Sequence, residues 1–465
     1  IHMWKSLLLP VNKITKTKHG VKKHASPHNE GELLPDGVEP DTILIMVPEW
    51  CEVKGKKDPL ILVDPEGATT FALGVDYVGE MKKGHLRMVM YLQKKKYRRS
   101  DGKEGGLGLH AGAKLIRIRD KRGKLVEKGL LFLGLTATGK TTHTFHHWWL
   151  DEKNGETIII KQDDFGTLTK EGKFIGTEQG CYLKLDGLDE KSQPLLYNAV
   201  RKGGKSVSIE NVYIDPQTLG PDFKRFDHPY VGKTTNSRGI IPSVLFGKYF
   251  DPDNIDVEEV DVIVFITRRN TIVPPVAKLK TPEQAAAYFM LGESVHSSGS
   301  TKDPNKIGQS IREVGTNPFI VGPEYEEGNI FLEILKEINK RRRKEGKPEV
   351  EVYLFNTGRV GAQDARDEKT GRKITIEDSV NIIKAIAKGT IEWEEDPDWC
   401  YLVPKKIEGM DYSQFDPRKY YTSEKYAELT EELRKERMEW LKKFEREGLV
   451  PEIAEEIEPM GAEKP

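Results

Sequence analysis

A glycine-rich loop is the feature that most constrains how this chain folds. The run GLTATGKTT (134–142) follows directly on the apolar run GLLFL (129–133) and matches the pattern G-x-x-x-x-G-K-S/T. Such a loop needs a strand before it and a helix after it, because its backbone N–H groups surround a phosphate at the start of the helix. The sequence therefore predicts an α/β fold that binds a nucleoside triphosphate.

The loop residues offer different groups to a nucleotide. We expect backbone N–H groups to hold the phosphates, Lys140 to bring its charge to the outer phosphate oxygens and Thr141 to ligate magnesium. The predicted nucleotide-binding set at the loop is Gly134, Thr136, Ala137, Thr138, Gly139, Lys140, Thr141 and Thr142.

Apolar, strand-like runs alternate with helical patterns after the loop. The runs at 157–161, 260–266 and 350–355 read as buried strands. A capping box at 281–284 predicts the start of a helix, and apolar residues at helical spacing predict another over 424–447. This alternation favours an α/β core.

The region before the loop has a different pattern. Short apolar runs at 42–47 and 59–63 predict a mostly β segment, and the basic run 93–99 lacks helical periodicity and predicts an exposed loop. We expect two domains, a substrate-side domain over 1–115 and a P-loop nucleotide-binding domain over 116–465 that includes a C-terminal helix and tail.

Composition limits the partners. Lys plus Arg (73) nearly equal Asp plus Glu (74), so no overall field points to nucleic acid or a membrane surface. No apolar run reaches the roughly 18 residues that a membrane span needs. Cys51, Cys181 and Cys400 lack disulfide or zinc-ligand spacing, which favours a cytoplasmic location. Small-molecule partners are expected, and the oligomeric state is left open.

Two aspartates follow the strand-like run at 157–161. Asp163 and Asp164 stand at its expected carboxyl end, where α/β sheets place their ligands. A metal ion bound to the β- and γ-phosphates needs an anionic ligand of this kind. By themselves the loop and the aspartates describe any P-loop kinase or hydrolase.

Further motifs narrow this class. They occur in one order along the chain: YVGEMKKG (77–84), His110, the loop, QDD (162–164), EQGCYLK (178–184), YNA (197–199), TNSR (235–238), VPPV (273–276) and FNTG (355–358). This order resembles the ATP-dependent phosphoenolpyruvate carboxykinase family over roughly residues 74–410.

The resemblance implies a fold, a reaction and cofactors. The implied fold is two-domain and α/β, with a mixed, β-rich N-terminal domain and a P-loop mononucleotide-binding domain around a cleft. The implied reaction converts oxaloacetate and ATP to phosphoenolpyruvate, carbon dioxide and ADP. The implied cofactors are ATP, Mg²⁺ and Mn²⁺, and the implied ligands of the manganese are Lys83, His110 and Asp164. Lysine ligates a metal only as a neutral amine, so its pKa must be lowered there.

The resemblance also assigns roles around the reacting groups. It places Arg238 on the γ-phosphate and the developing enolate, and Tyr77 near the substrate carboxylate and the departing carbon dioxide. The base of the nucleotide is expected between Lys373 and Ser379. The cations expected to bring two negative partners together are Lys82, Lys140, Lys184 and Arg238.

Two departures from the family pattern leave alternatives open. Residues 1–76 contain no Arg-Ser-Pro-Lys-Asp element to bind the substrate carboxylate, and KKHASP (22–27) is the nearest match. Arg268 and Arg269 replace an acidic, glycine-containing segment, which indicates either a more anionic ligand or an internal salt bridge. A carboxykinase, a kinase that phosphorylates a hydroxyl without decarboxylation, and a non-catalytic nucleotide sensor all remain compatible with the residues.

Overall fold

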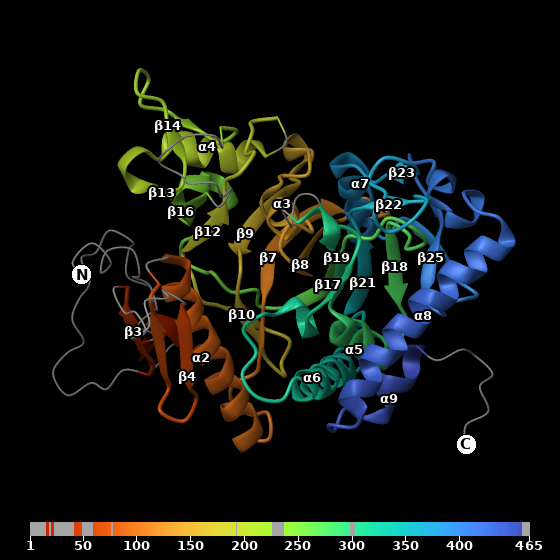
Figure 1. Ribbon diagram of the computed structural model, residues 1–465, viewed down its shortest axis with the longest axis horizontal. Coiled ribbons are helices and arrows are strands. Elements are labelled where there is room, and N and C mark those ends of the chain that lie inside the picture. The colour runs from red at the N-terminus through yellow and green to blue at the C-terminus, as the bar shows by residue number, and fades with distance from the viewer. Residues whose placement is uncertain are drawn as a thin grey trace.

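A mixed sheet of eight strands forms the centre of the molecule (Figure 1). The computed structural model describes residues 15–17, 20–22, 41–48, 59–75, 78–191, 193–225, 237–297 and 303–457. The strand order across the sheet is β24 (Ile391–Glu395), β25 (Leu402–Ile407), β18 (Val276–Leu279), β21 (Glu351–Asn356), β17 (Val260–Thr267), β8 (Leu125–Gly134), β7 (Ala111–Arg119) and β9 (Thr157–Gln162).

Three neighbouring strands of this sheet run parallel. β17 pairs in parallel with β8 on one side and with β21 on the other, and the remaining pairs are antiparallel. Their apolar residues are buried on both faces, as the sequence runs at 129–133, 260–266 and 350–355 predict. Because the three strands are parallel, the loops that follow β8, β17 and β21 meet at one edge of the sheet.

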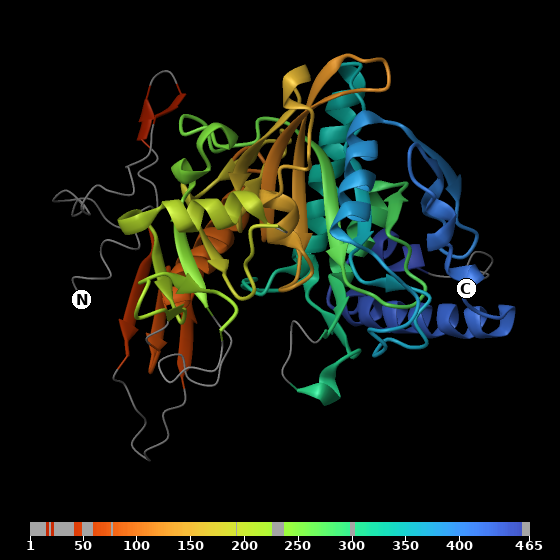
Figure 2. The same ribbon diagram turned by 90° about the horizontal axis from the view of Figure 1, so that it is seen from above.

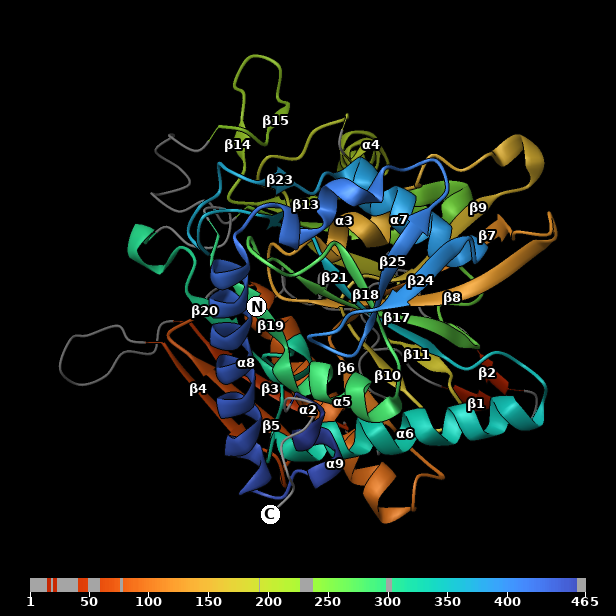
Figure 3. The ribbon, with the colours of Figure 1, turned by 90° about the vertical axis from the view of Figure 1, so that its right-hand side faces the viewer.

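Helices cover both faces (Figure 3). On one face lie α3 (Lys140–Phe145) and α7 (Ile376–Lys388), and on the other lie α5 (Pro282–Leu291) and α6 (Tyr325–Lys344). The side chain of Thr281 accepts a hydrogen bond from the backbone of Gln284 (3.0 Å), which confirms the predicted N-cap of α5. The long helix α8 (Ser423–Glu445) and the short α9 (Pro451–Ala454) pack outside α5.

A small three-stranded sheet and one long helix form the N-terminal part of the described chain (Figure 2). The sheet contains β3 (Ile43–Val47), β5 (Thr69–Leu73) and β4 (Leu60–Asp64), and α2 (Val78–Arg99) packs against it. Gly84 of α2 approaches Leu44 so closely that a Cβ there would lie 2.6 Å from its side chain. The N-terminal part thus contains the expected strands and, in addition, a helix of 22 residues.

The predicted exposed loop at 93–99 is wrong, because these residues form the last turns of α2. Lys94 and Tyr97 are buried. Lys94 Nζ donates to Glu327 Oε1 (2.6 Å) and the Tyr97 hydroxyl donates to Glu333 Oε1 (2.9 Å), both on α6. Lys94 and Tyr97 therefore contact carboxylates more than 200 residues away in the chain, and no local pattern could indicate these contacts.

Smaller sheets flank the central one. One contains β12 (Gly180–Lys184), β16 (Arg238–Pro242) and β13 (Ser208–Glu210), next to α4 (Pro194–Lys202), and another contains β11 (Phe174–Gly176), β10 (Gly166–Leu168) and β6 (Leu107–Leu109). The remaining short strands pair as β1 (Thr15–Thr17) with β2 (Gly20–Lys22), β14 (Tyr213–Ile214) with β15 (Pro221–Asp222), β19 (Glu293–Val295) with β20 (Ser310–Arg312), and β22 (Arg359–Val360) with β23 (Arg372–Lys373).

Two features of the fold bear on the sequence expectations. The boundary expected between residues 115 and 116 falls within β7, which pairs with both β8 and β9 of the central sheet. Within the described residues, no helix combines the length and the apolar character that crossing a membrane requires.

Candidate active site

The glycine-rich loop at residues 134–142, called the phosphate loop below, joins the carboxyl end of β8 to α3. Gly134 approaches Thr138 so closely that a Cβ would meet its hydroxyl at 2.5 Å, and Gly139 has a φ of 113°, which disfavours any residue with a side chain. The Thr138 hydroxyl donates to the carbonyl of Leu135 (2.8 Å), and the Thr357 hydroxyl, after β21, donates to the carbonyl of Thr138 (2.6 Å). The loop is thus held by its own residues and by the segment that follows β21, which lies two strands away from β8 in the sheet.

Asp164, just after β9, is the centre of a cluster of cations. Lys140 Nζ from the loop lies 2.7 Å from Asp164 Oδ1, and Lys82 Nζ from α2 lies 2.9 Å from Oδ2. His110 Nε2, between β6 and β7, lies 3.0 Å from Oδ1 and 2.8 Å from Lys140 Nζ. Lys82 also pairs with Glu178 at 3.1 Å. Segments predicted as separate motifs therefore converge on one carboxylate.

The tautomer of His110 follows from its second contact. His110 Nδ1 lies 2.7 Å from the carbonyl oxygen of Thr316, which only accepts hydrogen bonds, so Nδ1 carries the proton and Nε2 presents a lone pair in the neutral ring. Burial and the charge of Lys140 lower the pKa of His110, which favours the neutral form. The lone pair of His110 Nε2 and the carboxylate oxygen of Asp164 lie 3.0 Å apart and repel each other unless a cation lies beside both. Lys140 Nζ occupies that position.

The same donor set fits a divalent metal ion. Nitrogen and oxygen ligands of an octahedral ion with bonds of about 2.1 Å lie about 3 Å from one another, and the His110 and Asp164 atoms have this spacing. Within the described chain, no group of three or more His, Cys, Asp and Glu side chains is arranged to hold a metal. The nitrogens of Lys82 and Lys140 lie 2.9 and 2.7 Å from Asp164 and are the further nitrogen atoms of this donor set.

The carboxylates of the cluster differ in their acidity. Burial opposes ionisation of Asp164, but the charges of Lys140 and Lys82 outweigh it and hold the pKa of Asp164 well below its usual value. Burial and the charge of Asp164 raise the pKa of Asp163 to about 7, and its Oδ1 is buried without a hydrogen bond. Burial also raises the pKa of Glu178. Asp164 is thus the permanent anion of the group.

The two lysines of the GEMKKG motif have different surroundings. Lys82 lies mostly covered against Asp164 and Glu178, and these carboxylates raise the pKa of Lys82 although desolvation opposes its charged form. Lys83 is half-exposed and pairs with Glu80 at 3.7 Å. Neighbouring helical residues point about 100° apart, so only one of the two faces the cluster. The structure brings Lys82, and not Lys83, to Asp164.

Lys184 and Arg238 lie close together on the small sheet that contains β12 and β16. They are directly opposite each other where β12 pairs with β16. Lys184 Nζ pairs with Asp186 at 3.1 Å, and Arg238 Nη1 donates to the carbonyl of Ser237 (3.1 Å). The sequence motifs therefore supply a second pair of cations on the small sheet.

The expected base-side residues differ in exposure. Lys373 is exposed on β23, whereas Ser379 is buried within α7, where its backbone N–H donates to the carbonyl of Thr375 (3.0 Å). Thr141 is half-buried in the first turn of α3, next to Thr142. Tyr77 lies outside the described residues, as does most of the KKHASP segment.

Sequence reasoning missed two side chains that build the cluster. The Gln162 amide donates to the carbonyl of Glu178 (3.0 Å) and accepts from its backbone N–H (3.1 Å), so it holds Glu178 beside Lys82. Gln162 begins the QDD motif and Glu178 begins the EQGCYLK motif, so their positions within motifs were the available signal. Thr316 acts through its backbone carbonyl alone, which leaves no signal in a sequence.

The comparisons with known proteins agree with this geometry. The profile of the family described as phosphoenolpyruvate carboxykinase matches residues 29–413. A phosphoenolpyruvate carboxykinase (ATP) of Aeropyrum pernix is 30% identical over 404 residues, which cover 86% of this chain and 71% of that protein. Proteins of the same name from Moorella thermoacetica (25% over 405 residues, 85% and 68%) and Leptospira biflexa (27% over 381 residues, 80% and 61%) are also similar. The chain belongs to the phosphoenolpyruvate carboxykinase family.

Proposed function

We propose that this protein converts oxaloacetate and ATP to phosphoenolpyruvate, carbon dioxide and ADP, with Mn²⁺ and Mg²⁺ as cofactors. The observation that carries the proposal is the cluster in which the phosphate-loop Lys140 meets His110, Lys82 and Asp164. A kinase or a nucleotide sensor needs the loop, but neither requires a histidine and a second lysine on the same carboxylate. The ATP-dependent family to which the chain belongs uses ATP and divalent metals.

The reaction requires two negative groups to approach each other. Loss of carbon dioxide from oxaloacetate leaves an enolate, whose oxygen attacks the γ-phosphorus of ATP. Lys140 balances the phosphate charge, and Lys184 and Arg238, which lie opposite each other where β12 pairs with β16, stabilise the charge that develops on the transferred group. A bound divalent metal supplies Lewis-acid stabilisation of the enolate oxygen. The low exposure of the Lys82 and His110 side chains, 13% and 11%, favours a site from which most water is excluded.

The metal ligands are assigned on the same geometry. His110 and Asp164 hold the transition metal, and Thr141 at the start of α3 holds the magnesium of the nucleotide. The third ligand comes from the GEMKKG motif, where family resemblance selects Lys83 and the contact with Asp164 supports Lys82. A lysine ligand must lose its proton before a metal binds, which the metal charge itself favours.

We further propose a substrate side and a nucleotide side, formed by residues 1–115 and 116–465. Lys82 comes from the first part, while Lys140 and Asp164 come from the second, so the cluster joins both. Tyr77, five residues before Lys82, is assigned to the substrate carboxylate. The base is assigned to the strip from Lys373 to Ser379, and the exposure of Lys373 makes it the better placed of the two.

The proposal is tested by assaying phosphoenolpyruvate formed from oxaloacetate, ATP and Mn²⁺. The wild-type chain should form it only with metal present, and Arg238→Met should lose about three orders of magnitude in kcat, as for other groups that stabilise transferred charge. Arg117→Met is a matched control, because Arg117 pairs with Glu127 on an exposed part of β7. Nucleotide consumption that an alcohol stimulates and oxaloacetate never does would instead support the kinase.

A further inference from the structure

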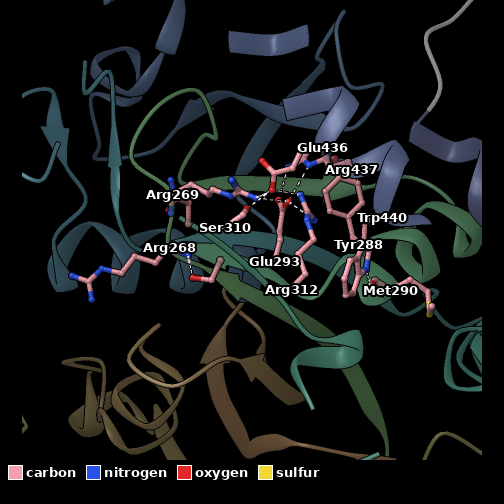
Figure 4. A network of polar contacts seen from close by, with 12 residues as sticks. Arg268, Arg269, Tyr288, Met290, Glu293, Ser310, Arg312, Glu436, Arg437 and Trp440 are labelled. Carbon is pink, nitrogen blue, oxygen red and sulfur yellow. Dashed lines mark hydrogen bonds and ion pairs between the residues drawn. The ribbon is translucent and has the colours of Figure 1, made fainter. Parts of the chain in front are cut away.

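Two consecutive arginines follow β17 at the edge of the sheet where the phosphate loop lies. The sequence left two alternatives for Arg268 and Arg269, an anionic ligand or an internal salt bridge. The structure assigns a different role to each. Figure 4 shows that the two side chains point in opposite directions, with Arg269 inside a polar network and Arg268 directed away from it.

Arg269 is part of a buried network. Its Nη2 lies 3.1 Å from Glu293 Oε2 and 3.1 Å from Glu436 Oε1 of α8. Glu293 also pairs with Arg312 (3.2 Å) and with Arg437 of α8, so three guanidinium groups surround one fully buried carboxylate (Figure 4). Arg269 is therefore paired with carboxylates inside the protein.

The backbone around the two arginines is fixed on both sides. The Arg269 N–H donates to Asn356 Oδ1 (2.9 Å), and its carbonyl accepts from the N–H of Arg359 (2.8 Å). The Arg268 carbonyl accepts from the N–H of Val295 in β19 (3.2 Å). Because these contacts come from β19 and from the end of β21, the Cα of Arg268 has a set position at the sheet edge.

The side chain of Arg268 reaches the phosphate loop. Its Nη1 donates to the carbonyl oxygen of Ala137 (3.0 Å). In the part of the chain that the structure describes, no carboxylate pairs with Arg268. Ala137 has a φ of 66°, a left-handed conformation that is uncommon for a residue other than glycine. A hydrogen bond from a charged donor to this residue holds the loop in a shape it does not adopt readily by itself.

We propose that Arg268 is a positioning residue for nucleotide binding, which acts by holding Ala137 and the phosphate loop in the binding conformation. The inference deepens the proposed function and rests on it, because the loop is taken to bind ATP. Pre-organisation of a loop lowers the ordering cost of binding, so its loss weakens affinity more than it slows chemistry. The network around Arg269 extends this support to α8.

The inference is tested by calorimetric titration of the full-length chain with Mg²⁺–ATP, without oxaloacetate. Arg268→Met should weaken binding about tenfold, the effect of losing one charged hydrogen bond. Arg268→Lys should restore part of this affinity, because an ammonium group can still donate to the Ala137 carbonyl. Arg117→Met, which removes an exposed surface pair, should bind as the wild type does.

Steady-state kinetics separate positioning from general damage. The KM for ATP should rise about tenfold in Arg268→Met, while kcat changes less than about twofold and thermal unfolding stays as in Arg117→Met. Wild-type affinity in both Arg268 variants overturns the inference, and so does a loss that appears only in kcat. A wild-type chain that binds ATP but forms no phosphoenolpyruvate would reject the proposed reaction and leave the role of Arg268 standing.

Discussion

Lys140 Nζ lies 2.7 Å from Asp164 Oδ1, so the lysine of the phosphate loop contacts the carboxylate after β9. The contact joins two proposed binding sites. Under the proposed function the loop binds the nucleotide, and Asp164 binds the transition metal together with His110. One ion pair therefore links nucleotide and metal binding, and changes at either residue should affect both.

The GEMKKG lysines provide a test within one helix. Lys82→Met should lower the affinity for Mn²⁺ by at least about tenfold, because it removes the lysine nitrogen next to Asp164. Lys83→Met is the matched control and should have a smaller effect, since Lys83 pairs with Glu80. Titration of Mn²⁺ by electron paramagnetic resonance measures both. The opposite ranking would show that α2 presents Lys83 when the metal binds.

The phosphate loop should depend on the backbone conformation of Gly139. In Gly139→Ala the new Cβ would meet nothing closer than 3.6 Å, so any effect comes from its φ of 113°. We expect a cost of about 1–2 kcal/mol in stability and at least about tenfold weaker ATP binding. Gly123→Ala is the control, because Gly123 also has a positive φ (76°) but lies in the turn between β7 and β8. It should lose stability without losing ATP affinity.

The buried carboxylate of Glu293 should be important for folding. Glu293→Gln leaves three arginines, Arg269, Arg312 and Arg437, around a neutral amide. Breaking a buried charge network in this way costs about 3–5 kcal/mol. Urea denaturation measures the loss. Glu333→Gln, which removes a partly exposed partner of Tyr97, should cost less than about 1 kcal/mol.

The same network predicts how stability depends on pH. Burial opposes ionisation of Glu436, but Arg269 and Arg312 outweigh it and lower the pKa of Glu436 to about 2. A carboxyl with a lowered folded-state pKa contributes stability above its unfolded value, near 4.5, and loses it as the pH falls toward 2. The wild type should therefore lose stability more steeply over this range than Glu436→Gln. Parallel curves of unfolding free energy against pH would contradict this.

The strands and helix starts of the central sheet could be predicted because apolar runs and capping residues identify them within short stretches of sequence. The buried runs that became β8, β17 and β21 are apolar on both faces, and the Thr281 cap begins α5 as expected. The prediction of an exposed loop at residues 93–99 was wrong because Lys94 and Tyr97 donate hydrogen bonds to carboxylates of α6, which are far away in the chain. Polar residues such as Lys94 are part of the buried face of α2, and this is recognised only when their partners on α6 are known.

For the candidate site, too, the sequence indicated some features, and others depend on the folded structure. The loop motif and the family resemblance indicated Asp164, His110 and Lys140 as site residues, and the structure brings these three side chains together. Which lysine of the adjacent pair faces Asp164 depends on the rotation of α2, which the motif does not encode. The opposite roles of Arg268 and Arg269 depend on β19 and α8, whose contacts only the folded chain shows.

The most direct test of the account is the stoichiometry of the reaction with oxaloacetate, ATP and Mn²⁺. Carbon dioxide, phosphoenolpyruvate and ADP should appear in equal amounts. Asp164→Asn should abolish all three together, because it leaves Lys82, Lys140 and His110 without their shared anion. ADP formed without phosphoenolpyruvate, or full activity in Asp164→Asn, would contradict the account.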